Sequence, residues 1–301
     1  MPGTTFPPLV PTVNGITGEI TVDQMLKQPT RVTRRVANLL AQRLLAERIF
    51  STGAPAVGGA VIYDRVLASD LYTTRDVQEI TPGSEFPIVD DEEVTPSVAA
   101  VAKRGGAALV TYESVRRNQW DVVNRKMTRL ANTVARKTDT VAMAVLAADP
   151  AVTSVVGTNW NNATSGDPVN DVMSLVSAIS NLDLGYEADT VLINPAQELA
   201  LFRLKSVRDS LPRENAATNP LLSGRINGLL SLQWYVSNRV PAGTAYVLQA
   251  GAPGSLHDEV PFYTRTIDRQ HNETWLLQAA RVTVPVITDP KSVIRLTGLA
   301  A

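Results

Sequence analysis

The sequence predicts an α+β fold that is organised around one very long helix. Three observations support this class. Residues 111–148 keep a helical apolar spacing with no internal Gly or Pro, and Asp149-Pro150 ends the stretch. Residues 58–110 and 258–288 show strand patterns before and after it. Residues 150–257 alternate helix and strand signals, which is typical of α/β structure.

Composition limits the classes of protein that fit. The 301 residues suffice for one large domain or two ordinary ones, and 44% hydrophobic residues allow a packed core. A net charge of -1 argues against a surface that binds nucleic acid throughout. No cysteine is present, so disulfides and cysteine metal sites are excluded, and two histidines leave little for catalysis. We find no signal peptide or membrane span and expect a soluble protein made in a cytosol.

Residues 1–57 predict an N-terminal arm followed by a helix. The first 18 residues contain four prolines and predict an extended arm without its own core. Residues 30–50 carry an apolar stripe at helical spacing, with Thr30 as a suitable N-cap, and GAPAVGG at 53–59 breaks the chain. The polar side of this helix is basic and carries Arg31, Arg34, Arg35 and Arg43.

Residues 58–110 predict a long two-stranded excursion. Strand candidates at 61–66 and 98–110, the second interrupted at Gly105-Gly106, flank about 30 residues with little core pattern. An isolated two-stranded ribbon is marginal in water, and so long a loop is unusual inside a compact domain. We therefore expect the excursion to pack against another subunit.

Residues 111–149 predict a single helix. About 35 helical residues span roughly 50 Å, which exceeds the roughly 26 Å diameter of a 100-residue domain. This length indicates a strut in an elongated protein, with a long core helix of an ordinary domain as the alternative. The expected apolar face consists of Val123, Met127, Leu130, Val134, Val141 and Val145.

After the long helix, the sequence predicts α/β structure and then β structure. Asp167-Pro168 begins a helix, with Gly185 after its end, and Pro195 opens another after a buried strand at 189–194. The further expectations are a loop at 208–228, strands at 232–237 and 244–250 joined by a VPAG turn, a boundary at GAPG 251–254, strands at 260–267 and 274–288 around a polar tip at 268–272, and a last strand at 292–297.

Charge is unevenly distributed along the chain. Residues 64–93 hold nine acidic and two basic residues, whereas residues 103–137 hold nine basic and two acidic ones. Two solvated faces explain this pattern equally well; the sharper hypothesis is that the acidic loop of one subunit lies on the basic helix of its neighbour. The candidates for this contact are Glu85, Asp90, Asp91, Glu92 and Glu93 with Arg116, Arg117, Arg125 and Lys126.

No catalytic motif emerges from the sequence. The glycine-rich phosphate motifs, HExxH and GxSxG are missing. The carboxylates at 90–93 could hold a metal or form an acid–base pair, but a solvated charge run is the simpler interpretation. His257-Asp258 could form a dyad, but no nucleophile accompanies it. We therefore expect no catalytic, cofactor or metal site and no enzymatic activity.

Four stretches, in this order and spacing, resemble the major capsid protein of tailed bacteriophages, which has the Hong Kong 97-like fold. VAKRGGAALVTYESVRRNQWDVV at 101–123 is similar to the family's return strand and spine-helix start. ADTVLINPAQELAL at 188–201 is similar to a strand ending in Asn-Pro before a helix. LQWYVSNRVPAGTAYVLQAG at 232–251 resembles paired strands around a turn, and TWLLQAARVTVPVITDPKSVIRLTG at 274–298 resembles the closing segment.

The resemblance covers about residues 30–299 and implies a division of the chain. Some relatives cross-link subunits through a loop lysine, but residues 67–102 contain none, so that chemistry is not expected here. The implied parts are an N-terminal arm and helix (1–57), an extended loop with flanking strands (58–110), a spine helix of the peripheral domain (111–149), an α/β axial domain (150–257), peripheral-domain strands (258–288) and a return to the axial domain (289–301).

The resemblance also implies a function and partners. We expect a structural protein that self-assembles as hexamers and pentamers into the icosahedral head shell of a tailed double-stranded DNA phage, without cofactor or membrane. A separate scaffolding protein, a portal and decoration proteins are expected partners, and assembly is expected in the host bacterial cytoplasm. The basic residues of 30–50 would face packaged DNA or pair with acidic groups of neighbours. An encapsulin-like cargo compartment is the alternative.

Overall fold

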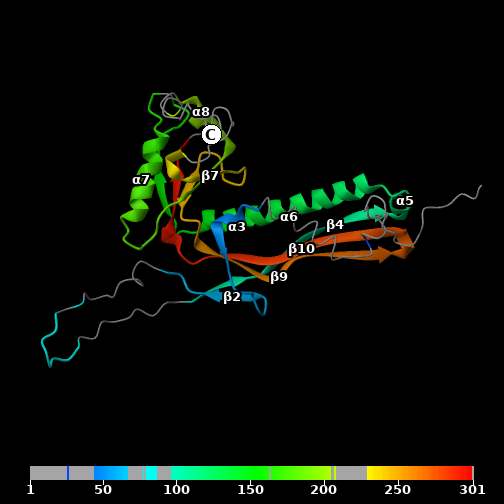
Figure 1. Ribbon diagram of the computed structural model, residues 1–301, viewed down its shortest axis with the longest axis horizontal. Helices are drawn as coiled ribbons and strands as arrows, with labels where there is room; N and C mark the ends of the chain where they lie inside the picture. The colour runs from blue at the N-terminus through cyan, green and yellow to red at the C-terminus, as the bar shows by residue number, and fades with distance from the viewer. Residues whose placement is uncertain are drawn as a thin grey trace, which may run out of the picture.

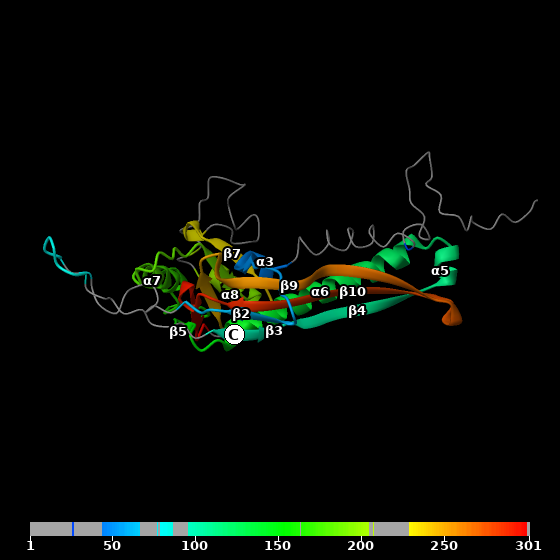
Figure 2. The same cartoon turned by 90° about the horizontal axis from the view of Figure 1, so that it is seen from below.

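The computed structural model describes residues 26, 44–66, 77, 79–86, 96–162, 164–204, 207 and 229–299. Figures 1 and 2 show an elongated molecule, in which a long helix and long strands run side by side along its length. A second sheet with its helices lies at one end. The expected arm at 1–18, Arg31, Arg34, Arg35 and Arg43, and the expected loop at 208–228 lie outside the described residues.

The expected single helix at 111–148 is in fact two helices. A short α5, Tyr112–Arg116, is capped by Thr111, whose side chain accepts a hydrogen bond from the Ser114 N–H. The long α6, Trp120–Ala148, follows after a break in which Asn118 has a φ of 49°. Asparagine is one of the few residues that adopt this left-handed conformation readily, so the chain turns here without Gly or Pro.

The expected apolar face of α6 is confirmed in its first half, whereas Val141 and Val145 of its second half are only partly buried. Val123, Met127 and Val134 are buried as expected. Towards the C-terminus the buried stripe passes through Thr138 and Asp139. Their polar atoms are satisfied, because Thr138 Oγ1 donates to the Val134 carbonyl and Asp139 Oδ1 accepts from a main-chain N–H. A prediction from the spacing of apolar residues misses this part of the buried face, because Thr138 and Asp139 are polar.

Helix α6 packs on a four-stranded sheet whose strand order is β1-β9-β10-β4. Leu277 and Ala279 of the sheet share a core with the first half of the helix. Strand β10 pairs antiparallel with both β9 and β4, so β4 is an edge strand. The strands are β1 Phe50–Thr52, β9 Gly251–Arg269, β10 Thr274–Ile287 and β4 Ala102–Thr111.

Two glycine-containing segments lie inside strands rather than between them. The expected interruption at Gly105-Gly106 is wrong, since β4 continues through both. A Cβ at Gly105 would lie 2.5 Å from the Ala279 carbonyl oxygen, so the close approach of β10 requires glycine. The expected boundary at 251–254 is also wrong, because these residues begin β9. A Cβ at Gly254 would lie 2.0 Å from the Val286 carbonyl oxygen.

The second sheet has five strands in the order β5-β11-β8-β6-β7. Strand β6 lies between β7 and β8, so the expected direct pairing of the strands around the VPAG turn is wrong: their connection crosses β6. The strands are β5 Thr153–Val156, β6 Thr190–Ile193, β7 Gln233–Val236, β8 Ala245–Leu248 and β11 Val293–Thr297.

The two helices that cover this sheet begin as the sequence predicts. Helix α7, Pro168–Ser180, is capped by Asp167, which accepts a hydrogen bond from the Asn170 N–H at 3.1 Å. Helix α8, Pro195–Arg203, is capped by Asn194 in the same way. Each has proline in its first turn, where a missing N–H costs nothing. Short 3-10 helices complete the described chain at Leu229–Ser231, Gln270–Asn272 and Pro290–Ser292.

The excursion begins as a separate two-stranded sheet. Strands β2, Ala60–Tyr63, and β3, Ser97–Ala100, pair antiparallel and lie below β9 and β10 in the view of Figure 1, on the side away from α6. The body anchors its base, because Val66 N donates to the Thr288 carbonyl and Arg65 forms an ion pair with Asp149. The two-stranded character expected for 58–110 is therefore confirmed at its base.

A short helix marks the end of the expected N-terminal helix. Helix α3, Ala46–Ile49, ends one residue before the expected limit, because Phe50 begins β1. Its buried residues join a core cluster with the C-terminal half of α6 and with both sheets, so this cluster connects the two sheets. Among the described helices, none is long and apolar enough to cross a membrane.

Candidate subunit-contact surfaces

The excursion exposes large apolar side chains. Four of them are 67–84% exposed: Ile62 in β2, Val98 in β3, Val57 just before β2, and Phe86 farther along the excursion. A sheet of two short strands has no second layer to bury these side chains. Apolar surface of this kind in a projecting element is typical of a protein–protein contact.

Acidic side chains accompany this apolar surface. Glu79 and Glu85 are exposed on either side of a turn, which is closed by a 3.0 Å hydrogen bond from Ser84 N to the Thr81 carbonyl. The remaining acidic candidates, Asp90, Asp91, Glu92 and Glu93, lie outside the described residues.

The predicted basic partners lie on α5 and in the first turns of α6, but they do not form one site. Arg116 ends α5 and Arg117 follows it, and both side chains are exposed. Arg125 is exposed on α6, whereas Lys126 donates a hydrogen bond to the Leu109 carbonyl of β4. Lys126 is thus engaged within its own chain, and the pairing of all four with an acidic loop stays a prediction.

A cationic cavity between α6 and β4 was not expected from the sequence. Its volume is about 300 Å³, and Leu130 and Val134 form an apolar part of its wall. Arg104 enters from β4, and burial lowers its pKa below the ordinary value. The full lining is Arg104, Gly105, Gly106, Leu130, Thr133, Val134, Arg136, Lys137 and Thr140, which includes three cations and no carboxylate. The basic residues of 103–137 were visible in the sequence. Which of them line one cavity depends on how β4 pairs with β10 and packs against α6, and the sequence does not show this.

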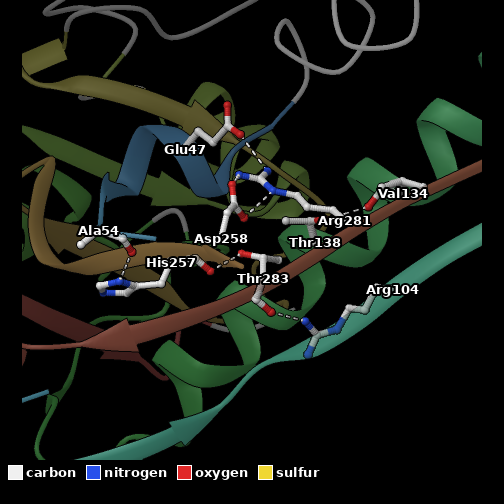
Figure 3. A network of polar contacts seen from close by, with 9 residues as sticks. All are labelled: Glu47, Ala54, Arg104, Val134, Thr138, His257, Asp258, Arg281 and Thr283. Atoms are coloured by element: carbon white, nitrogen blue, oxygen red, sulfur yellow. Dashed lines mark hydrogen bonds and ion pairs between the residues drawn. The ribbon is translucent and has the colours of Figure 1, made fainter. Parts of the chain in front are cut away.

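A polar network attaches α3 to the four-stranded sheet (Figure 3). Arg281 of β10 bonds to both carboxylate oxygens of Asp258 at 2.8–2.9 Å and to Glu47 at 2.8 Å. Burial lowers the pKa of Arg281, but the bonds to these carboxylates outweigh burial and raise it. The fork of the guanidinium thus holds two elements that are far apart in the chain.

A buried carboxylate supports the start of the same helix. Asp139 Oδ1 accepts a 2.9 Å hydrogen bond from the Ala46 N–H, at the N-terminus of α3. Burial raises the pKa of Asp139 to about 6, although main-chain hydrogen bonds act in the opposite direction.

His257 and Asp258 do not form a dyad. His257 Nδ1 lies 2.7 Å from the Ala54 carbonyl, to which it must donate, and its Nε2 lies 2.7 Å from Ser255 Oγ. Asp258 instead binds Arg281. In the part of the chain that the structure describes, no group of three or more His, Asp or Glu side chains could hold a metal ion.

The fold is that of several solved structures. A phage-related protein from Bordetella bronchiseptica RB50 aligns with a TM-score of 0.63 at 13% identity, covering 89% of this chain and 96% of that one. The capsid structure of the cyanophage P-SCSP1u aligns with a TM-score of 0.64 at 14% identity, covering 86% and 89%. A virus-like particle from Pyrococcus furiosus aligns with a TM-score of 0.60 at 11% identity, covering 88% and 98%.

Sequence comparison identifies the family. No curated protein matches the chain by sequence. A family model for phage capsid proteins matches residues 93–296, which is about two-thirds of the chain and includes β4, α6, β9 and β10. The mixed helix and sheet content agrees with that of the capsid structures. This chain therefore belongs to the phage capsid protein family.

Proposed function

We propose that this chain is the major capsid protein of a tailed double-stranded DNA phage, and that its copies assemble into an icosahedral head shell. The observation that carries the proposal is the apolar surface of the excursion in a chain of the phage capsid family. Ile62 and Phe86 are more than 70% exposed on an element that cannot bury them itself. A second copy of the chain is the partner that a shell supplies.

Such a contact would join different surfaces of neighbouring copies, which suits assembly by repetition. The excursion of one copy would meet the body of the next, which is a head-to-tail contact between different surfaces. Contacts of this kind repeat around a ring or a lattice. Hexamers and pentamers of this chain would be the rings.

The parts of the molecule have roles in this proposal. Residues 58–110 would be the extended loop and residues 111–149 the spine helix of a peripheral domain completed by 258–288. Residues 150–257 would form the axial domain, to which 289–301 return. The two separate sheets support this division, although β9 begins at Gly251, before the proposed boundary.

Further partners follow from the role in a head. A separate scaffolding protein, a portal and decoration proteins would join the shell, and assembly would occur in the host bacterial cytoplasm. Arg31, Arg34, Arg35 and Arg43 would face packaged DNA, because phosphate attraction needs no sequence reading. A protein that acts by assembly requires no catalytic residue.

Electron microscopy of the purified chain tests the proposal. The wild-type chain should form shells, and deletion of residues 70–92 should leave soluble protein that forms none. Phe86→Asp should also prevent assembly, because it places a charge in the contact, whereas Phe86→Leu should retain it. Normal shells from the deletion would exclude the proposed contact.

The cargo separates a phage head from an encapsulin-like compartment. The structural match to a virus-like particle from Pyrococcus furiosus shows that the fold alone does not distinguish them. The family match favours the phage capsid. Particles from infected cells should therefore contain nuclease-protected DNA, and a packaged protein in its place would favour the compartment.

A further inference from the structure

We infer that the cationic cavity between α6 and β4 is the receptor for the acidic turn at residues 79–86 of a second copy of this chain. The inference rests on the proposed shell and names a contact within it. The sequence placed the contact at α5 and the first turns of α6. The cavity lies nearer the middle of α6, and we place the contact there instead.

The cavity has the features of a built site. Arg104 is oriented by hydrogen bonds to the main-chain carbonyls of Thr283, at 2.9 Å, and Ala102, at 3.4 Å. Its guanidinium has five N–H groups, so donors remain for a ligand. Arg136 and Lys137 extend from the adjacent turn of α6 and are exposed. Among the described residues, no carboxylate pairs with these three cations.

The acidic turn complements this hollow in both charge and polarity. Glu79 and Glu85 supply two exposed carboxylates, and Phe86 beside them is 79% exposed. The cavity offers cations beside the apolar side chains of Leu130 and Val134. A phosphate backbone would satisfy the cations but would leave that apolar wall without a partner, so an acidic peptide fits better than nucleic acid.

The turn must come from another copy. Figures 1 and 2 show segment 79–86 beyond the end of the molecule that bears α7, away from the middle of α6. The volume of about 300 Å³ is at the low end of ligand pockets, which suits the side chains of one turn.

Disulfide trapping tests the contact, since the chain has no cysteine. Glu85→Cys combined with Lys137→Cys, in assembled shells under mild oxidation, should give covalent ladders of subunits. Glu85→Cys with Thr133→Cys, an uncharged position in the same lining, is the second test pair. Glu85→Cys with Lys103→Cys is the matched control, because Lys103 is exposed on β4 outside the cavity. We expect at least tenfold more ladder from either test pair than from the control.

Charge exchange provides an independent measurement. Arg136→Glu with Lys137→Glu should reduce the shell yield at least tenfold, Lys103→Glu should not, and adding Glu79→Lys with Glu85→Lys should restore most of the yield. Equal ladders in test and control shells, or no rescue, would refute the inference while the shell itself stands. Normal shells that lose packaged DNA would assign the cavity to nucleic acid instead. If the wild-type chain formed no shells, the proposed function itself would fail.

Discussion

Asp139 places an ionisable group in the interior at the junction of α6 and α3. Its ordinary pKa is 3.8, and burial raises it to about 6 in the folded chain. The folded state therefore binds this proton more tightly than the unfolded state. The stabilisation from the protonated group is complete below about pH 3.8 and is lost as the pH rises through about 6.

Substitution of Asp139 should make this dependence visible. Asp139→Asn keeps an oxygen that can accept from the Ala46 N–H but removes the titration. The wild-type contribution should fall by up to about 3 kcal/mol for two pKa units between pH 4 and 6.5. In the variant this fall should disappear, measured by urea unfolding of unassembled protein across that range. Asp183→Asn, at an exposed position, should leave the dependence as in the wild type.

The role of some individual residues could be predicted from the sequence. Asp167 was found because an N-cap acts on the next few residues and leaves a local pattern. The roles of Asp139 and Arg281 depend on partners 93 and 234 residues away, at Ala46 and Glu47. No local pattern encodes such pairs, so only the folded chain reveals them.

At the scale of elements, Gly105 determines how closely β4 and β10 approach. A Cβ there would lie 2.5 Å from the Ala279 carbonyl oxygen and 2.6 Å from the Ala280 Cβ. Gly105→Ala should lower the free energy of unfolding by about 1–3 kcal/mol, because backbone must move.

Gly106→Ala is the matched control for this prediction. Its Cβ would meet only the end of the flexible Leu130 side chain, at 3.1 Å. Urea unfolding of the two variants should therefore give a clearly larger loss at position 105. A similar loss at both positions would show that glycine is needed there for backbone freedom and not for close approach.

The elements themselves were largely predictable, but their neighbours were not. Strand β6, helices α7 and α8 and strands β10 and β11 lie close to their expected positions, because caps, prolines and apolar runs mark them. The separation of β7 and β8 by β6 was missed. Strand order depends on which apolar faces pack together, and the turn between two strands does not disclose it.

At the scale of the whole molecule, the separation of opposite charges predicts a dependence of assembly on salt. Residues 64–93 carry a net charge of -7, from nine acidic and two basic residues, and residues 103–137 carry +7, from nine basic and two acidic ones. If these regions meet across subunits, shell yield should fall as salt rises towards about 1 M, where screening acts within about 3 Å.

Charge reversal should imitate the effect of salt. Asp90→Lys with Asp91→Lys should impair assembly at physiological salt, and a compensating Arg-to-Glu change on the long helix should partly restore it. Shell yield against salt for each single change and their combination gives a double-mutant cycle. Unchanged yield and salt tolerance would show that the acidic run is a solvated surface.

The strand order also has a consequence for synthesis of the protein. Strand β10 lies between β9 and β4, and β11 lies between β5 and β8, so each sheet has an inner strand that is translated after all its other described strands. A chain whose translation stops before residue 274 therefore lacks β10, the strand that joins β4 to the rest of its sheet. Neither sheet can close until β10 and β11 have been translated, so shorter chains cannot present the surfaces on which a growing particle depends.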